Sequence, residues 1–295
     1  MLRRIMLCVL PLLLFTAAGI RPASAEQPKL KALILDGQNN HDWRATTPVL
    51  RRALLDSERF DVDVATAPAG RDLSGFRPNF AAYDVVVSNY NGHPWSPETR
   101  QAFVDYVRGG GGFVVIHAAN NAFGDWKEYN EMIGLGGWGG RDQRSGPYVF
   151  FQDGEIVRDE SKGGGGHHGR QHAFQVVVRN TEHPVTAGMP MTWMHNQDEL
   201  YDRLRGPAAN MTVLATAHSD PATGGSGRQE PMIVTIDYGQ GRVFHTPLGH
   251  ADYSMKCAGF VATLQRGAEW AATGRVTIPI PDDFPKPDKT SIRDY

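Results

Sequence analysis

Short apolar runs rich in β-branched residues alternate with helical patterns along the first half of the chain, and this alternation constrains the fold more than any other feature. The runs cover residues 31–36, 60–66, 84–89 and 112–117. Apolar residues at helical spacing fill 46–57, and Ser96 and Gly109 mark the start and end of a second helix. Strands separated by helices predict a parallel sheet with helices on both faces, and such sheets bind ligands beyond the carboxyl ends of their strands.

The second half of the chain continues the same α/β pattern after an interruption. Strand-like runs resume at residues 173–178, 211–217, 232–237 and 242–248, and a helix is predicted over 255–273. Between residues 134 and 170 glycine is dense and periodicity is weak, which is typical of a lid or binding loop. We therefore expect one domain over 26–278, with 134–170 as an insertion or lid and 279–295 as a proline-rich, extended and peripheral tail.

Residues 1–25 have the three parts of a secretory signal peptide. Arg3 and Arg4 form the basic start, residues 5–18 are apolar, and Ala-Ser-Ala at 23–25 forms a small-residue cleavage site. The apolar run is shorter than the roughly 20 residues that a membrane-spanning helix needs. We expect cleavage near Ala25, a periplasmic or secreted protein, and no stable membrane insertion.

The charge of the exported chain bears on its class of partner, and its cysteine content bears on whether it can form a disulfide. Removal of residues 1–25 discards three arginines, which leaves 27 basic and 32 acidic side chains and a net charge of −5 with histidine neutral. This balance does not favour nucleic acid as a partner. Cys257 is then the single cysteine, so no internal disulfide is expected. There is no phosphate-binding glycine loop between a first strand and a helix, so we expect no nucleotide cofactor.

Polar side chains follow three of the predicted strands where each strand ends. These loops contain Asn40 with His41, Asn91, and His117 with Asn120. Because the carboxyl ends of parallel strands meet at one edge of a sheet, we expect these side chains to lie together. A single histidine is more often an ordinary hydrogen-bonded residue, but several at one sheet edge indicate acid–base or metal chemistry.

His117 and His250 are the most informative of these residues. His117 follows a buried strand and precedes two alanines, as in the sharp strand-to-helix turn that raises a side chain above a sheet. His250 follows the last predicted strand, and Asp252 could fix its tautomer, with a capping role at the last helix as the alternative. We expect His117 and His250 to act as bases or metal ligands, with Asp252 orienting His250. With His41 they could bind one divalent metal ion, zinc or similar.

Two further stretches place histidine in polar surroundings. The run His195–Tyr201 (HNQDELY) suits a polyhydroxylated ligand, although a solvated helix start would use similar residues. The segment 166–172 holds three histidines that could bind a metal, but flanking glycines are not typical of a rigid zinc site. The expected substrate-binding residues are Asn40, His41, Asn91, Asn120, His195, Glu199 and Tyr201.

Four of these pieces together resemble the trehalose-utilisation, or ThuA-like, family: the His41 loop, the strand at 110–117, the 195–201 stretch and the segment 238–250. The resemblance covers about residues 31–272. It implies an α/β, flavodoxin-like three-layer sandwich with a mostly parallel central sheet, as in class I glutamine amidotransferases. In those enzymes a cysteine occupies the place of His117, and a later His-x-Glu pair resembles His250 and Asp252. Without the thiol we expect no glutamine amidotransferase activity.

The resemblance also implies carbohydrate metabolism, in pathways where a partner sugar dehydrogenase oxidises a glucoside to its 3-keto form. A ketone at C3 acidifies the proton at C2, and the glycosidic oxygen at C1 can then leave by elimination. An imidazole base would remove that proton, while a metal ion or hydrogen-bond donors stabilise the enediolate. We expect an enzyme that cleaves, hydrates or isomerises keto-sugars or glycosides, that is, a lyase, hydrolase or isomerase on a small carbohydrate.

Two other functions remain open at this point. A non-catalytic carbohydrate-binding protein would stack sugar faces on one or more of the tryptophans Trp43, Trp95, Trp126 and Trp138. A metal-dependent hydrolase of another substrate would use the same histidines. Convergence of His41, His117, His195 and His250 on one point would favour metal or acid–base chemistry, whereas scattered positions would make each an ordinary histidine.

Overall fold

The computed structural model describes residues 28–295, so the predicted signal peptide lies outside the described residues. The strands are β1 (Leu30–Asp36), β2 (Phe60–Thr66), β3 (Val85–Ser88), β4 (Gly112–Ile116), β5 (Tyr148–Gln152), β6 (Glu155–Asp159), β7 (His167–His168), β8 (His172–Val178), β9 (Thr192–Asp198), β10 (Tyr201–Asp202), β11 (Met211–His218), β12 (Gln229–Tyr238) and β13 (Gly241–Thr246). The helices are α1 (Trp43–Asp56), α2 (Pro97–Arg108), α3 (Lys127–Ile133), α4 (Asp252–Met255) and α5 (Ala258–Thr273). None of them is long and apolar enough to cross a membrane.

One large mixed sheet organises the chain, with strand order β2-β1-β3-β4-β13-β12-β11-β8-β9 and a β5–β6 hairpin attached to β12. The five strands from β2 to β13 pair in parallel. The strands from β13 to β9 pair antiparallel. Because β12 and β13 are joined by a tight turn, they must run antiparallel. The expected parallel arrangement therefore holds for one half of a mixed α/β fold.

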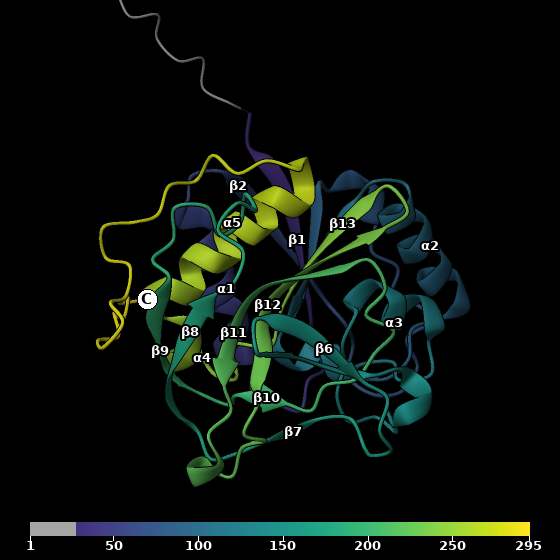
Figure 1. Ribbon diagram of the computed structural model, residues 1–295. Coiled ribbons are helices and arrows are strands. Elements are labelled where there is room, and N and C mark those ends of the chain that lie inside the picture. Colours follow the sequence, from purple (N-terminus) through teal and green to yellow (C-terminus); the bar gives the residue numbers. More distant parts are fainter. Residues whose placement is uncertain (1–27) are drawn as a thin grey trace, which may run out of the picture.

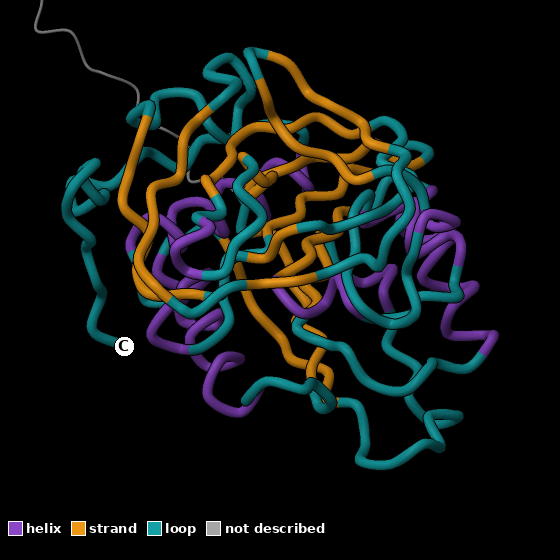
Figure 2. Tube along the Cα trace, turned by 60° about the horizontal axis from the view of Figure 1, so that its bottom comes forward, coloured by secondary structure: helices purple, strands orange, loops and turns teal. Residues whose placement is uncertain are grey.

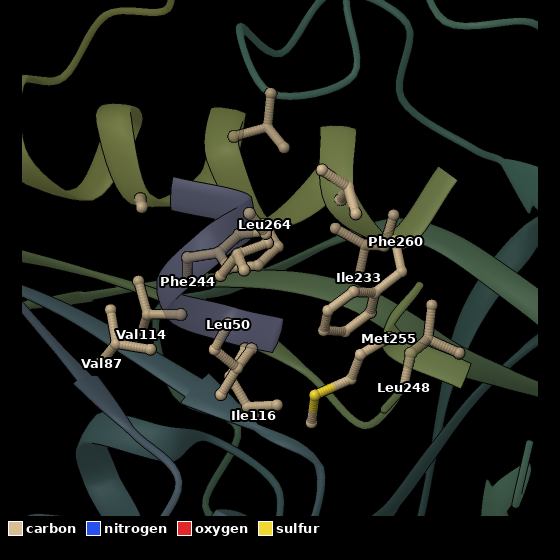
Figure 3. Close-up of a cluster of buried hydrophobic side chains, with 14 of the residues drawn as sticks. Leu50, Val87, Val114, Ile116, Ile233, Phe244, Leu248, Met255, Phe260 and Leu264 are labelled. Carbon is tan, nitrogen blue, oxygen red and sulfur yellow. The ribbon is translucent and has the colours of Figure 1, made fainter. Parts of the chain in front are cut away.

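Helices cover both faces of this sheet, and each face has its own apolar core (Figure 1). On one face α1 and α5 pack on the strands, and Leu50 of α1 and Phe260 of α5 lie in the same cluster as Val114 (Figure 3). On the other face α2 and α3 contribute Phe103 and Met132. Apolar residues on both faces explain why the central strands read as continuous hydrophobic runs in the sequence.

The carboxyl ends of β1, β3, β4 and β13 lie at one edge of the sheet, because these strands are parallel neighbours. In Figure 1 this edge faces downward, where β7 and β10 also lie, and Figure 2 turns it toward the reader. The loops that follow these four strands therefore meet there. This is the edge at which an α/β sheet binds its ligands.

Residues 134–170 contain more regular structure than expected. Strands β5 and β6 form a hairpin whose turn residues, Asp153 and Gly154, both have positive φ. An Asp-Gly pair between strands is a strong hairpin signal, and the weak apolar period around it concealed the strands. The tail from residue 279 lies against the domain without a helix: the Met194 N–H donates to the Lys286 carbonyl and the Ala258 N–H to that of Ser291.

Candidate metal centre and ligand pocket

Four side chains from four separate loops converge at the carboxyl edge of the sheet. They are His41 after β1, His117 after β4, Glu199 between β9 and β10, and His250 after β13. Each offers one ligand atom, and these atoms all lie within 4.8 Å of one another. Three imidazoles and one carboxylate are a donor set that zinc and other divalent transition metals accept. The group could therefore hold a metal ion.

His117 is held in a strained turn that directs one nitrogen into the cluster. It follows β4 directly and begins a short 3-10 helix, His117–Asn121, with a φ of +43°. A left-handed backbone costs a residue with a side chain about 1–3 kcal/mol, and such strain is typical of functional sites. The ring Nδ1 lies 2.6 Å from the Pro247 carbonyl oxygen. Because a carbonyl only accepts, Nδ1 carries a proton, so the neutral form of the ring directs the lone pair of Nε2 into the cluster, 3.6 Å from Glu199 Oε2.

His41 and His250 complete the cluster around Glu199. The ring centroid of His41 lies 4.9 Å from that of His117 and 4.5 Å from that of His250. His41 Nε2 is 3.2 Å from the Tyr201 hydroxyl, and His250 Nδ1 is 3.0 Å from Glu199 Oε2. The buried His117 Nε2 has no hydrogen-bond partner among the described residues. An unpaired, inward-facing imidazole nitrogen beside a carboxylate fits a bound cation.

The charge states of His41 and Glu199 also suit a cation, whereas contact with Glu199 raises the pKa of His250 against the effect of burial. Burial lowers the pKa of His41 to about 4, and the neighbouring His117 and His250 act in the same direction, so this imidazole is neutral at pH 7. Burial alone would raise the pKa of Glu199, but contacts with His117 and His250 hold it well below the usual range. The site therefore presents a neutral imidazole and an ionised carboxylate, which are the forms that bind metals.

A buried carboxylate beneath the cluster fixes its backbone. Asp198 is fully buried and accepts hydrogen bonds from the backbone N–H groups of Glu199, Gly249 and His250 at 2.7–2.9 Å. Its Oδ2 also lies 2.7 Å from Nε2 of the fully buried His195. Burial opposes charge on His195, yet the hydrogen bond to Asp198 raises its pKa to about 9. A buried ion pair thus supports two of the four cluster residues.

A pocket of about 540 Å³ opens beside the cluster and shares His41 and Glu199 with it. Its size lies within the range of small-molecule sites. Its other lining residues are Asn40, Asn91, Asn121, Trp138, Gly139, His168 and Tyr201. The Tyr201 ring packs 4.1 Å from the His117 ring and connects the pocket wall to the cluster. Cluster and pocket therefore form one site.

The structure places the sequence-predicted residues in two groups. The site contains His41, His117, His250, Asn40, Asn91, Glu199 and Tyr201. Asn120 does not reach it, because its side chain is buried against His245 at 3.1 Å, and Asn121 lines the pocket in its place. His195 is also a correction, since it supports Asp198 from beneath and does not face the pocket.

The expectation that Asp252 orients His250 is corrected as well. Asp252 is the first residue of α4, and its carboxylate pairs with Lys256 at 2.9 Å, one helical turn away. The groups that contact His250 are instead Glu199 at Nδ1, Gln171 at Nε2 and Asp198 at the backbone N–H. Closeness in sequence was a poor guide because the helix turns Asp252 away from the ring.

The segment 166–172 divides its three histidines among different environments. His168 lines the pocket, and its Nε2 lies 3.8 Å from Glu199 Oε1. His167 pairs with the buried Asp202 at 2.8 Å, and His172 Nδ1 lies against the Arg170 carbonyl. Among the tryptophans considered for sugar stacking, Trp95 and Trp126 are buried in the core, and Trp138 lines the pocket.

Three residues of the site were not singled out from the sequence: Asp198, Gln171 and Asn121. Asp198 and His195 lie on β9, where the inward residues Trp193 and His195 alternate with less buried ones. That period of two was the available signal for a strand, and it would have shown His195 to face the interior. Gln171 contacts Glu199 and His250 across 28 and 79 residues, respectively, a pairing that no local pattern contains.

A second buried carboxylate, Glu230, should make the stability of the fold depend on pH. Burial raises its pKa from 4.5 to about 7, and the Ser226 hydroxyl donates to it at 2.7 Å. A carboxyl whose folded pKa is raised stabilises the fold below its unfolded pKa, and that stability is lost as pH rises from about 4.5 to 7, up to about 3 kcal/mol. We expect Glu230→Gln to be more stable than wild type at pH 8 but not at pH 4.5. Chemical denaturation at both pH values measures this. The prediction would be contradicted if the difference in free energy of unfolding between variant and wild type were the same at pH 8 and at pH 4.5.

Comparison with known proteins agrees with this description of the fold. A ThuA-like protein of Parabacteroides merdae is 50% identical, with a TM-score of 0.88 over 90% of this chain and 98% of that one. A ThuA-like protein of Bacteroides uniformis is 21% identical, with a TM-score of 0.58 over 87% and 97% of the two chains, and shares the fold. No curated protein matches the sequence.

Fold and site together define an α/β protein with a histidine- and carboxylate-lined centre at the carboxyl edge of a mixed sheet. The model of the ThuA family, described as trehalose utilisation, matches residues 31–271. The chain belongs to this family, which links it to carbohydrate metabolism and confirms the resemblance seen in the sequence.

Proposed function

We propose that this protein is a metal-dependent enzyme of carbohydrate metabolism that acts on keto-sugars or related glycosides. The observation that carries the proposal is the convergence of His41, His117, Glu199 and His250 beside a pocket of ligand size. These four residues would hold the ion. When bound, a divalent cation supplies Lewis-acid stabilisation of negative charge that develops on a ligand oxygen.

Proton transfer requires a base that is not itself committed to the ion, and His168 meets this condition. Its Nδ1 lies 2.8 Å from the Gly169 carbonyl oxygen, so Nδ1 carries a proton, and in the neutral form of the ring Nε2 offers its lone pair. His168 lines the pocket on β7, which is held by antiparallel pairing to β10. A base on such a fixed ribbon is already positioned for a bound ligand.

The chemistry that we propose begins at the carbon next to a sugar ketone. His168 Nε2 accepts the proton from that carbon, and the electron pair of the C–H bond moves into the C–C–O system, leaving negative charge on the ketone oxygen. In cleavage, the carbonyl is restored, a C=C bond forms to the neighbouring carbon and its C–O bond breaks, and the leaving oxygen takes the proton from His168 to depart as a hydroxyl group. In isomerisation, His168 returns the proton to the former ketone carbon while the proton of the adjacent hydroxyl passes to the former ketone oxygen. Hydration is the reverse of elimination: water adds at the neighbouring carbon, and His168 returns the proton to the carbon next to the ketone.

The environment that we propose lies outside the cytoplasm, on the basis of the signal-peptide pattern at residues 1–25. A partner sugar dehydrogenase would then supply the ketone. N-terminal sequencing of the protein from the cell envelope of its own host tests this, with Glu26 as the expected first residue. A protein recovered from the cytosol with residues 1–25 intact would contradict it.

The shared proton step can be tested whichever product forms. We expect the metal-loaded protein in D2O to exchange the proton next to the ketone of a 3-keto-glucoside, as followed by NMR. The variant His168→Asn should slow exchange by about 100-fold or more while its metal content stays unchanged. His172→Asn is the matched control, because this histidine lies outside the lining of the pocket.

Three outcomes decide between the parts of the proposal. Exchange that depends on His168 but not on His172 supports it. Exchange that is equally fast in His168→Asn removes the role of this residue. The proposed function would be overturned if wild type loaded with zinc, manganese, cobalt or nickel showed no exchange and no conversion.

A further inference from the structure

Trp138 occupies a backbone conformation that a tryptophan rarely adopts. Its φ is +49°, in the left-handed region, although glycines stand on both sides of it in the sequence. Its N–H donates to the Gly165 carbonyl at 2.7 Å, and its own carbonyl accepts from the Arg141 N–H at 2.9 Å. Such a conformation is strained for a residue with a side chain, so the surrounding contacts must hold it. The result is an aromatic ring kept at the pocket wall.

Arg141 ties this wall to the loop that follows His117. Its guanidinium is buried and donates to the carbonyls of Gly137 at 2.9 Å, Asn121 at 3.1 Å and Ala122 at 2.7 Å, and to the Asn130 side chain. These partners are carbonyl and amide oxygens, so the arginine acts as a clamp between two backbone segments. Trp138 and Asn121, which both line the pocket, are thereby held in place.

The ring of Trp138 lies close to the candidate metal centre. It packs edge-on against Tyr201 at 4.7 Å, and Tyr201 in turn packs against His117 at 4.1 Å. One aromatic ring therefore separates Trp138 from a cluster residue. A ligand that reaches the cluster through this pocket passes along the tryptophan.

The remaining wall of the pocket is polar but carries little charge. Asn40, Asn91 and Asn121 line it, and the buried Oδ1 of Asn121 has no hydrogen-bond partner among the described residues. No lysine or arginine is among the lining residues, and Glu199 is the ionised acidic group. Pockets for phosphate usually provide basic side chains or helix N-termini. Amides and an aromatic face suit hydroxyl groups and the apolar C–H face of a sugar ring.

We propose that Trp138 is the platform on which an uncharged, unphosphorylated sugar ring stacks, with Asn121 accepting a ligand hydroxyl and Arg141 positioning both. This inference rests on the proposed function, because it takes the ligand to be a carbohydrate. It goes beyond it by assigning the ring-binding residue and by excluding sugar phosphates as preferred ligands.

The experiment measures binding apart from turnover. Zinc-loaded His168→Asn protein, as the slow-turnover background, is titrated with a methyl 3-keto-glucoside and with its 6-phosphate by calorimetry. We expect Trp138→Ala in this background to raise the Kd for the neutral sugar by about 10-fold or more, and Trp138→Phe to retain most of the affinity. Trp43→Ala is the control, because Trp43 does not line the pocket. The 6-phosphate should bind at least about 10-fold more weakly than the neutral sugar.

The possible results separate this inference from the proposed function. An unchanged Kd in Trp138→Ala, or a 6-phosphate that binds as tightly as the neutral sugar, would overturn the inference even if wild type exchanges the ketone-adjacent proton. Binding that depends on Trp138 without any proton exchange by wild type would leave the inference standing and remove the proposed reaction. A loss of zinc in Trp138→Ala would show that the tryptophan supports the centre and would also overturn its role as a platform.

Discussion

Replacement of Glu199 by glutamine is expected to weaken divalent-metal binding by more than about 100-fold and to lower turnover of a 3-keto-glucoside by about 1000-fold or more. Glu199 is the single carboxylate of the cluster, and it contacts both His117 and His250. Glutamine keeps the size of the side chain but removes the negative charge. The cation would then face three imidazoles and a neutral amide.

Asp252→Asn is the matched control for Glu199→Gln. Asp252 is the carboxylate that the sequence favours as partner of His250, whereas its side chain lies on Lys256. We expect this control to keep full metal content and activity. Metal retention and normal turnover by Glu199→Gln, or equal losses in both variants, would contradict the site described here.

Replacement of Asp198 by asparagine is expected to destabilise the fold by about 3–5 kcal/mol, because it leaves the buried, protonated His195 without its partner. For a domain of this size the loss corresponds to a fall in Tm of roughly 10 °C. Asparagine also replaces one carboxylate oxygen by an amide nitrogen, which cannot accept. Either the Gly249 N–H, which donates to Oδ2, or the N–H groups of Glu199 and His250, which donate to Oδ1, then lose their acceptor. Urea and thermal unfolding measure the effect.

Asp252→Asn again provides the comparison, because a partly exposed pair at the surface such as Asp252–Lys256 contributes about 1 kcal/mol or less. A variant Asp198→Asn that unfolds within about 1 kcal/mol of wild type would show that the buried pair does not hold the cluster backbone. Loss of stability with unchanged metal affinity would limit the role of Asp198 to the fold.

Sequence alone located the parallel half of the sheet and the loops at its carboxyl edge. The runs before His117 and after residue 31 are apolar throughout, since helices cover both of their faces. The strand end at His117 and the later His250 therefore identified the edge where the site forms. Glu199 and Tyr201 were singled out through the composition of the run 195–201, although the strands on either side of Glu199, β9 and β10, were not recognised.

What sequence could not supply depends on long-range geometry. Asn121 and not Asn120 lines the pocket, because the short 3-10 turn after His117 determines which side chain faces outward. Asp252 was assigned to His250 from proximity in the chain, yet α4 directs it to Lys256. The real supports of the cluster, Asp198 and Gln171, reach His250 across 52 and 79 residues.

Elemental analysis of the purified protein tests the central claim most directly. After incubation with zinc, manganese, cobalt or nickel and removal of free ions, about one divalent ion per chain should remain on wild type, with anomalous diffraction placing it among His41, His117, Glu199 and His250. A wild-type protein that binds none of these ions, or that binds one elsewhere while the four side chains stay apart from it, would contradict a metal centre at this edge of the sheet.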